Sequence, residues 1–186
     1  PTLRIGLVAG APSPPALVKE AEQRLGLKLL NAYGMTELGA ISAVRLDDAE
    51  VARFETVGRP LPGYEVKIVD DGRQEMGPGE IGEVLVRSEY VTLGYNGRPD
   101  LTAEAFAGEW FCTGDLGSLD ACGHLRLYGR KKELVKVAGF NVYPAEVEAL
   151  LTTHPEVAEA AVIGVPHPRF GEALWAYVKP RPGIEL

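Results

Sequence analysis

Hydrophobic and polar residues follow different patterns in successive parts of this chain, and each pattern predicts a different kind of structure. Residues 3–9 form a short apolar run, which predicts a buried strand. Residues 13–26 predict a helix, because Ser13 suits the cap, prolines fall in the first turn and Gly26 suits the end. The apolar stripe of this helix consists of Leu17, Val18, Ala21 and Leu25. Residues 27–30 predict a second strand, and the strand–helix–strand order favours a parallel sheet.

The pattern changes from residue 58 onwards, with Gly and Pro at short intervals as far as residue 97, and it predicts antiparallel strands. Residues 64–69 alternate between apolar and polar, and residues 81–86 form the next strand candidate. Residues 116–119 and 124–128 flank a glycine-containing turn, which predicts a hairpin. We therefore expect a small antiparallel barrel or sheet in this part of the chain.

A mixed unit of helix and strands is expected after Arg130. Pro144 suits the first position of a helix. Residues 160–165 and 174–178 predict strands. The core face of the helix consists of Val147, Leu150 and Leu151.

The expected fold class is therefore α/β and α+β. We place the end of a parallel-sheet part at residues 1–57, a β-barrel-like part at 58–129, a hinge at 130–133 and a partial α+β unit at 134–186. The first strand follows Pro1 almost at once, so we expect the chain to be a piece of a longer protein.

Composition and charge narrow the classes of function. The 186 residues carry a net charge of −7 and no long basic run, which argues against a nucleic-acid partner and against adhesion to acidic membranes. No apolar stretch approaches the ~20 residues of a transmembrane segment. Cys112 and Cys122 are too few and too badly spaced for a zinc site or a disulfide framework. These features favour a cytoplasmic protein, and they leave a homo-oligomer open.

The first candidate site lies where the strand near residue 30 runs into a glycine turn that carries Tyr33, Thr36 and Glu37. Ligands of parallel sheets bind beyond the carboxyl ends of the strands. A threonine hydroxyl can donate to a phosphate oxygen there, a carboxylate suits Mg²⁺ and a tyrosine ring can stack on a base. On spacing alone, the favoured interpretation is a plain turn with a capping threonine and a surface glutamate.

Other candidates are weaker when taken singly. Asp115 is expected in a glycine-flanked turn. Its carboxylate either accepts hydrogen bonds from the two hydroxyls of a ribose or accepts them from the backbone of its own turn. Taken alone, the residue favours the second interpretation. Arg130 is either a contact to hydroxyl or phosphate oxygens or a solvated residue at a junction. The histidines share no metal-like spacing and are interpreted as turn or surface residues: His124, His154 and His167.

Five segments taken in order give a stronger signal than any of them alone. They are residues 9–12, 33–37, 94–106, 110–115 and 129–148. This order resembles the adenylate-forming superfamily, which comprises acyl-CoA synthetases, luciferases and peptide-synthetase adenylation domains. Within it, YGMTE at the second segment and GFNVYPAEVE in the last look like a fatty-acyl or aryl-CoA ligase.

The resemblance implies a two-step reaction of ATP, Mg²⁺, CoA and a small-molecule carboxylic acid. The carboxylate attacks the α-phosphate of MgATP, giving acyl-AMP and pyrophosphate, and the thiol of CoA then displaces AMP. By the same resemblance, Thr36 contacts the phosphate, Glu37 binds Mg²⁺ and Asp115 takes the ribose hydroxyls. Adenine lies between the residue 10–12 backbone and Tyr33. The implied nucleotide-binding segments consist of Gly10, Ala11, Pro12, Tyr33, Gly34 and Met35.

The resemblance also assigns roles after residue 129. Arg130 assists at the nucleotide, and Lys132 matches a hinge about which a C-terminal lid rotates between the half-reactions. Lys136 and Gly139 lie where the lid meets the active site and the pantetheine tunnel during thioester formation. Lys136 is thus implied to be catalytic, although exposed lysines are more often solvated charges.

Two alternatives from other classes stay open. One is a non-catalytic module that binds an adenine nucleotide or a partner protein, and the other is a peptide-synthetase-type adenylation domain. The printed sequence contains neither the phosphate loop of the family, which resembles TSGTTGxPKG, nor its C-terminal PKxxxGK-like catalytic lysine. We expect the first upstream of Pro1 and the second beyond Leu186.

The isolated 186-residue chain is therefore expected not to form acyl-AMP. Without the phosphate loop, nothing in it is expected to position the triphosphate for in-line attack. The measurement is carboxylate-dependent ATP–pyrophosphate exchange by the purified chain. Exchange at the rate of an ordinary enzyme would contradict this prediction.

Overall fold

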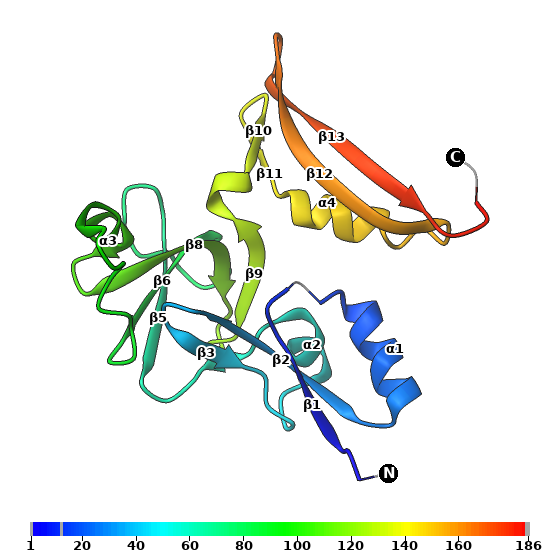
Figure 1. Cartoon of the computed structure of the whole chain (residues 1–186), viewed down its shortest axis with the longest axis horizontal. Coiled ribbons are helices and arrows are strands. Elements are labelled where there is room, and N and C mark those ends of the chain that lie inside the picture. Colours follow the sequence, from blue (N-terminus) through cyan, green and yellow to red (C-terminus); the bar gives the residue numbers. More distant parts are fainter. Residues whose placement is uncertain (1, 12, 185–186) are drawn as a thin grey trace. The chain divides into compact units, whose positions relative to one another are not determined.

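The chain forms two compact units, which a computed structural model describes over residues 2–11 and 13–184 (Figure 1). The first unit comprises Pro1–Leu127 and the second Tyr128–Leu186. The finer division at residues 57 and 133 stays a prediction. Among the described residues, no helix combines the length and the apolar character that crossing a membrane requires.

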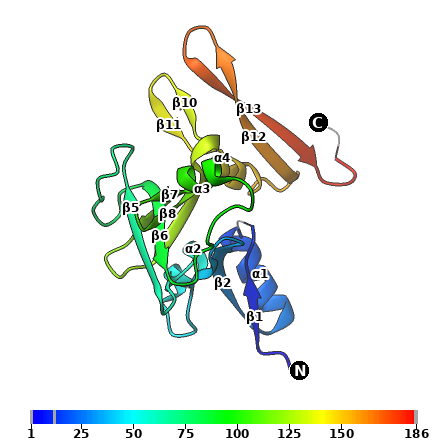
Figure 2. The same cartoon turned by 60° about the vertical axis from the view of Figure 1, so that its left-hand side comes forward.

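A four-stranded sheet opens the first unit, with the order β1-β2-β3-β4. Strands β1 and β2 are parallel, which confirms the expected strand–helix–strand unit, and Figures 1 and 2 show them side by side. The elements are β1 (Ile5–Val8), α1 (Pro15–Leu25), β2 (Lys28–Met35), β3 (Gly39–Ala43), α2 (Glu50–Glu55) and β4 (Arg59–Pro60).

The expectation of a buried first strand is wrong. The side chains of Leu3 and Leu7 are 63% and 67% exposed. The reason is position: β1 is an edge strand with a single neighbour among the described strands.

Helix α1 ends as expected but begins and packs differently. Gly26 caps its C-terminus in the left-handed conformation, φ 65°. At the other end the cap position is Pro14, with no side-chain hydrogen bond, so Ser13 is not the cap. Of the predicted stripe only Val18 is buried, while Leu17 and Leu25 are more than half exposed. Helical spacing indicated which face of the helix is apolar, but it did not indicate how much of that face the rest of the protein covers.

An antiparallel sheet follows, with the order β5-β6-β8-β7 and with β9 paired to β8. It forms an open half-barrel, and the predicted hairpin is the β8–β9 pair. The elements are β5 (Tyr64–Val69), β6 (Gly82–Ser88), α3 (Pro99–Ala105), β7 (Phe106–Ala107), β8 (Trp110–Leu119) and β9 (Leu125–Arg130).

The two sheets of the first unit share one core. Backbone hydrogen bonds also join them: the Val57 N–H donates to the Leu125 carbonyl, and the Leu125 N–H donates to the Gly58 carbonyl, each at 2.8 Å. Apolar burial and these bonds hold the two sheets in a defined relation. The buried cluster consists of Tyr33, Leu38, Ile41, Ile68, Val84, Val86, Phe111 and Leu125.

His124 lies at the β8–β9 turn, where the sequence suggested a turn or surface residue, but it is buried rather than on the surface. Its Nδ1 lies 3.0 Å from Asp120 Oδ2, and its Nε2 lies 3.2 Å from Asp48 Oδ1. Burial alone raises the pKa of Asp48, but the Arg45 N–H, His124 and Arg59 outweigh burial and hold that pKa below its ordinary value. The histidine therefore links the β8–β9 turn to the segment after β3 through polar contacts that residue type alone does not reveal.

The second unit is an α+β unit with the sheet order β11-β10-β13-β12. Pro144 opens its helix as expected, but Leu150 is 70% exposed and does not belong to the core face. The predicted strands are confirmed and pair with each other over almost their whole length. The elements are a 3₁₀ helix η1 (Lys131–Glu133), β10 (Val135–Val137), β11 (Phe140–Val142), α4 (Pro144–Leu151), β12 (Val157–His167) and β13 (Gly171–Pro180).

Gly58 packs closely against the end of β3 within the first sheet, so Gly58→Ala is expected to unfold the first unit or to lower its free energy of unfolding by about 3 kcal/mol or more. Its φ is +76°, and a Cβ there would lie 1.9 Å from the Ala43 carbonyl carbon and oxygen. Gly79→Ala is the matched control, because φ is +84° but no atom lies within 4 Å of the added Cβ. It is expected to cost about 1 kcal/mol.

The measurement is urea unfolding in a Trp175→Phe background, where Trp110 alone reports on the first unit. Equal losses of stability in the two variants would contradict the account of Gly58 as a point of close backbone approach.

Candidate functional site

The Tyr33-Gly34-Met35 segment lies inside strand β2, so the predicted glycine turn begins later than expected, at Thr36. The register between β2 and β3 shifts between Tyr33 and Gly34. A Cβ on Gly34 would lie 2.3 Å from the Gly39 carbonyl oxygen, so glycine lets the two strands approach at this irregularity. Tyr33 is 9% exposed, and Thr36 is exposed in the turn.

Asp115 lies in strand β8 rather than in a turn, which corrects the expectation for it. Glu83 pairs with Leu116 and Leu85 pairs with Cys112, so residues 113–115 together face the single residue 84 of β6. Gly114, with φ 70°, permits this bulge. The flanking glycines signalled a turn in the sequence, whereas in the structure Gly114 re-aims side chains within a continuous strand.

A buried hydrogen bond joins the two motifs: the Tyr33 hydroxyl donates to Asp115 Oδ2. Asp115 is 8% exposed. Its backbone N–H donates to Thr113 Oγ1 at 3.1 Å, and the Thr113 hydroxyl donates to the Val84 carbonyl oxygen at 2.7 Å. The bulge is thus fixed by Thr113, and the carboxylate by Tyr33.

Glu37 is bound to a segment that the sequence motifs left without a role. The Tyr95 hydroxyl donates to Glu37 Oε1 at 2.9 Å, and the Thr92 N–H donates to the Glu37 carbonyl oxygen at 2.7 Å. Thr36, next to Glu37, is exposed. Two hard oxygen groups therefore stand together at the end of β2, one of them held in place.

Gly10 and Ala11 lie at the same edge of the sheet as Tyr33. Strands β1 and β2 are parallel with Val8 opposite Asn31, so both chains leave the sheet on one side. Gly10 has φ 87°, and Ala11 is exposed. Pro12, the remaining member of this predicted segment, lies outside the described residues.

The other predicted site residues belong to the second unit. Arg130 ends β9 and is exposed, and Lys132 lies exposed in η1. Lys136 is an exposed residue of β10, and Gly139, with φ 88°, makes the turn between β10 and β11. The predicted site residues of the first unit thus lie near one another. The four predicted residues of this paragraph belong to the second unit.

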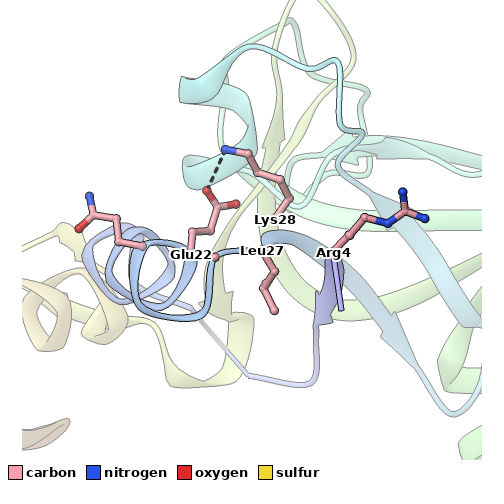
Figure 3. A pocket seen from close by; sticks show the side chains of 6 residues that line it. Arg4, Glu22, Leu27 and Lys28 are labelled. Carbon is pink, nitrogen blue, oxygen red and sulfur yellow. Dashed lines mark hydrogen bonds and ion pairs between the residues drawn. The ribbon is translucent and has the colours of Figure 1, made fainter. Parts of the chain in front are cut away.

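A hollow of about 330 Å³ lies elsewhere on the first unit (Figure 3). It lies by Arg4 and Lys28, where β1 and β2 begin, whereas ligands of parallel sheets bind at the opposite ends of strands. Burial alone raises the pKa of Glu22 there, but the Leu29 N–H, Arg53 and Lys28 lower it below the ordinary value. Figure 3 shows Lys28 reaching Glu22, which forms a charge-compensated structural cluster rather than a ligand site.

Sequence reasoning missed Thr113 and Tyr95 as members of the site. Thr113 directly precedes the glycine of the bulge. Its role becomes visible only once the structure shows that bulge. Tyr95 is 58 residues from Glu37 in the chain, and no local pattern indicates that they meet.

Comparison with known proteins gives two matches to family models. Residues 1–96 match the model described as AMP-binding enzyme, and residues 146–186 match the model described as AMP-binding enzyme C-terminal domain. The first model alone covers more than half of the chain.

Several characterised proteins are similar to the chain. The 2-succinylbenzoate–CoA ligase of Geobacillus kaustophilus is 39% identical over 98% of this chain and 37% of its own length. A fatty acid–[acyl-carrier-protein] ligase of Streptomyces coeruleorubidus is 38% identical over 98% of the chain and 36% of its own length. The chain thus spans about a third of the length of these relatives.

A solved structure is similar throughout the chain as well. The o-succinylbenzoate CoA synthetase of Bacillus subtilis, solved in complex with an acyl-adenylate intermediate, aligns with a TM-score of 0.88 and 34% identity. The match covers 98% of this chain and 37% of that one. The expected fold of an adenylate-forming protein is thereby confirmed.

If Asp115 accepts hydrogen bonds from ribose hydroxyls, as the resemblance implies, Asp115→Ala in the full-length protein is expected to weaken AMP binding about tenfold or more. Tyr33→Phe keeps the ring and is expected to change AMP affinity less. The measurement is isothermal titration with AMP, combined with thermal unfolding of both variants and of the double variant.

The double variant separates binding from packing. Asp115→Ala removes the acceptor of a buried hydroxyl, so part of its loss of stability should be recovered when Tyr33→Phe removes that hydroxyl. Wild-type affinity for AMP in Asp115→Ala would refute the ribose role.

Proposed function

The chain belongs to the family of AMP-binding enzymes, and we propose that the protein carrying it is an ATP-dependent acyl-CoA ligase. In this proposal the protein activates a carboxylic acid as acyl-AMP and transfers the acyl group to the thiol of CoA. The observation that carries the proposal is the bond between Tyr33 and Asp115, because it joins two separate motifs into one polar site at the edge of the sheet. The similarity to a CoA ligase and to a synthetase bound to an acyl-adenylate supports the same reaction.

The first unit supplies the nucleoside contacts in this proposal. Adenine lies between the Gly10–Ala11 backbone and the Tyr33 ring, and the Asp115 carboxylate accepts from the ribose hydroxyls. Because Tyr33 holds Oδ2 of Asp115, the carboxylate is oriented before the nucleotide arrives, which lowers the entropy cost of binding. Gly34 and Met35 continue the same segment and complete the binding surface.

The residues near the end of β2 fit Mg²⁺. The described residues contain no cluster of three or more metal-ligating side chains. Mg²⁺ in nucleotide sites usually takes one or two carboxylates and completes its shell with phosphate and water oxygens, so Glu37 is a sufficient protein ligand. Thr36 donates its hydroxyl to a phosphate oxygen. Bound together with ATP, the ion would offset the negative charge that develops on the phosphoryl oxygens.

The second unit carries the residues proposed for the thioester-forming half-reaction. Lys132 is the hinge residue, Arg130 assists at the nucleotide, and Lys136 and Gly139 line the approach of the pantetheine arm of CoA. The tight β10–β11 turn supports this role for Gly139, because φ 88° places backbone rather than a side chain at the tip.

A carrier-protein thiol is a second candidate acceptor. The specific observation is the relative that transfers a fatty acid to acyl-carrier protein, since its identity to this chain nearly equals that of the CoA ligase. The two acceptors end in the same phosphopantetheine thiol, so the residues near that thiol do not distinguish them.

The test is a pyrophosphate-release assay on the full-length protein with a panel of aliphatic and aromatic carboxylic acids. We expect one class of acid to give pyrophosphate and, with CoA present, sustained AMP release with loss of free thiol. A single burst with CoA but turnover with phosphopantetheinylated carrier protein would favour the second acceptor. Nucleotide binding without pyrophosphate release from any acid would favour a non-catalytic module.

A further inference from the structure

Two hydrogen bonds from one short segment reach Glu37. The Tyr95 hydroxyl donates to Glu37 Oε1 at 2.9 Å, and the Thr92 N–H donates to the Glu37 carbonyl oxygen at 2.7 Å. One bond fixes the carboxylate and the other fixes the backbone. Because both come from residues 92–95, the side chain of Glu37 is held relative to its own main chain.

The segment that carries Tyr95 is itself held against helix α3. The Tyr95 N–H donates to Thr102 Oγ1 at 2.9 Å, and the Thr102 hydroxyl donates to the Arg98 carbonyl oxygen at 3.0 Å. Gly94 has φ 137°, and a Cβ on it would lie 2.6 Å from Thr102 Cγ2, so glycine permits this close approach. The Tyr95 hydroxyl therefore projects from a loop whose backbone is anchored on both sides of residue 95.

Glu37 differs from the structural carboxylate Glu22 in the kind of partner that holds it. Glu22 pairs with the Arg53 guanidinium and the Lys28 ammonium, which compensate its charge. A tyrosine hydroxyl orients a carboxylate without adding positive charge. Within residues 2–11 and 13–184, Glu37 forms no ion pair and its Oε2 accepts no hydrogen bond. Among the described residues, one oxygen of Glu37 is therefore anchored and the other has no protein partner.

We infer that Tyr95 is a positioning residue for the divalent cation that accompanies ATP: it holds Oε1 of Glu37 so that Oε2 faces the ion. The inference rests on the proposed function, in which Glu37 is the protein ligand of Mg²⁺. Groups that hydrogen-bond the ligands of a metal set their orientation, and removing one costs about tenfold to a hundredfold in metal affinity. Tyr95 makes no contact with the ion and acts only through Glu37.

The test uses the full-length protein and Mn²⁺ as the probe, measured by electron paramagnetic resonance in the presence of α,β-methylene-ATP. Tyr95→Phe removes only the hydroxyl and is expected to weaken Mn²⁺ binding about tenfold. Tyr90→Phe is the matched control: it removes a tyrosine hydroxyl near the same segment whose partner is Glu89 rather than Glu37. Affinity for the analogue in EDTA should stay unchanged in both variants.

Glu37→Gln separates the inference from the proposal beneath it. If Glu37→Gln weakens Mn²⁺ binding but Tyr95→Phe does not, the positioning role is wrong and the metal ligand stands. If neither variant changes Mn²⁺ affinity, the role of Glu37 in the proposed function is wrong as well. Support requires that Tyr95→Phe weaken binding in the wild-type background and add nothing in the Glu37→Gln background. This dependence on Glu37 is a result that a general loss of packing would not give.

Discussion

The buried hydrogen bond between Tyr33 and Asp115 is the interaction on which the candidate site depends. Its two residues come from different sheets and from motifs 82 positions apart in the chain. The shared apolar core brings the sheets together, but burial alone is non-directional and does not choose which polar groups meet. The hydroxyl–carboxylate bond makes that choice, because a buried donor or acceptor left without its partner costs about 1–3 kcal/mol. The packing of the two sheets and the geometry of the candidate site therefore depend on each other in the first unit.

Irregular strands, rather than loops, aim the candidate side chains. The register shift beside Gly34 and the bulge at residues 113–115 both fall within named strands. A regular strand would place its side chains strictly on alternate faces, and a bulge changes that direction locally. The residues on either side of each irregularity still pair with the neighbouring strand. The side chain whose direction changes is therefore held as firmly as the strand itself. This explains why the glycines of both motifs are needed although neither lies in the turn that the sequence indicated.

The sequence predicted the elements better than it predicted their surroundings. Residues 64–69 were predicted as a strand with the bounds that the structure has, because alternation depends only on neighbouring residues. Leu25 was expected on a core face but is exposed, and His124, interpreted as a turn or surface residue, is buried, because exposure depends on what packs against a residue from elsewhere. For the candidate site, motif order predicted Tyr33, Glu37 and Asp115. The partners Thr113 and Tyr95 required coordinates, because a hydrogen bond across strands or loops leaves no periodic trace in the chain.

A tyrosine hydroxyl holds the Glu37 carboxylate of the first unit, and this choice of partner has a physical consequence. An arginine or lysine would fix a carboxylate as firmly, but its charge would also satisfy the carboxylate, as Arg53 does for Glu22. A neutral donor supplies direction and leaves the charge for a ligand. For Glu37 the ligand would be a cation, and a carboxylate already compensated by arginine would attract a cation much less. Preorganisation without neutralisation is therefore the property that separates Glu37 from Glu22, although the two residues are identical in type and only fifteen positions apart.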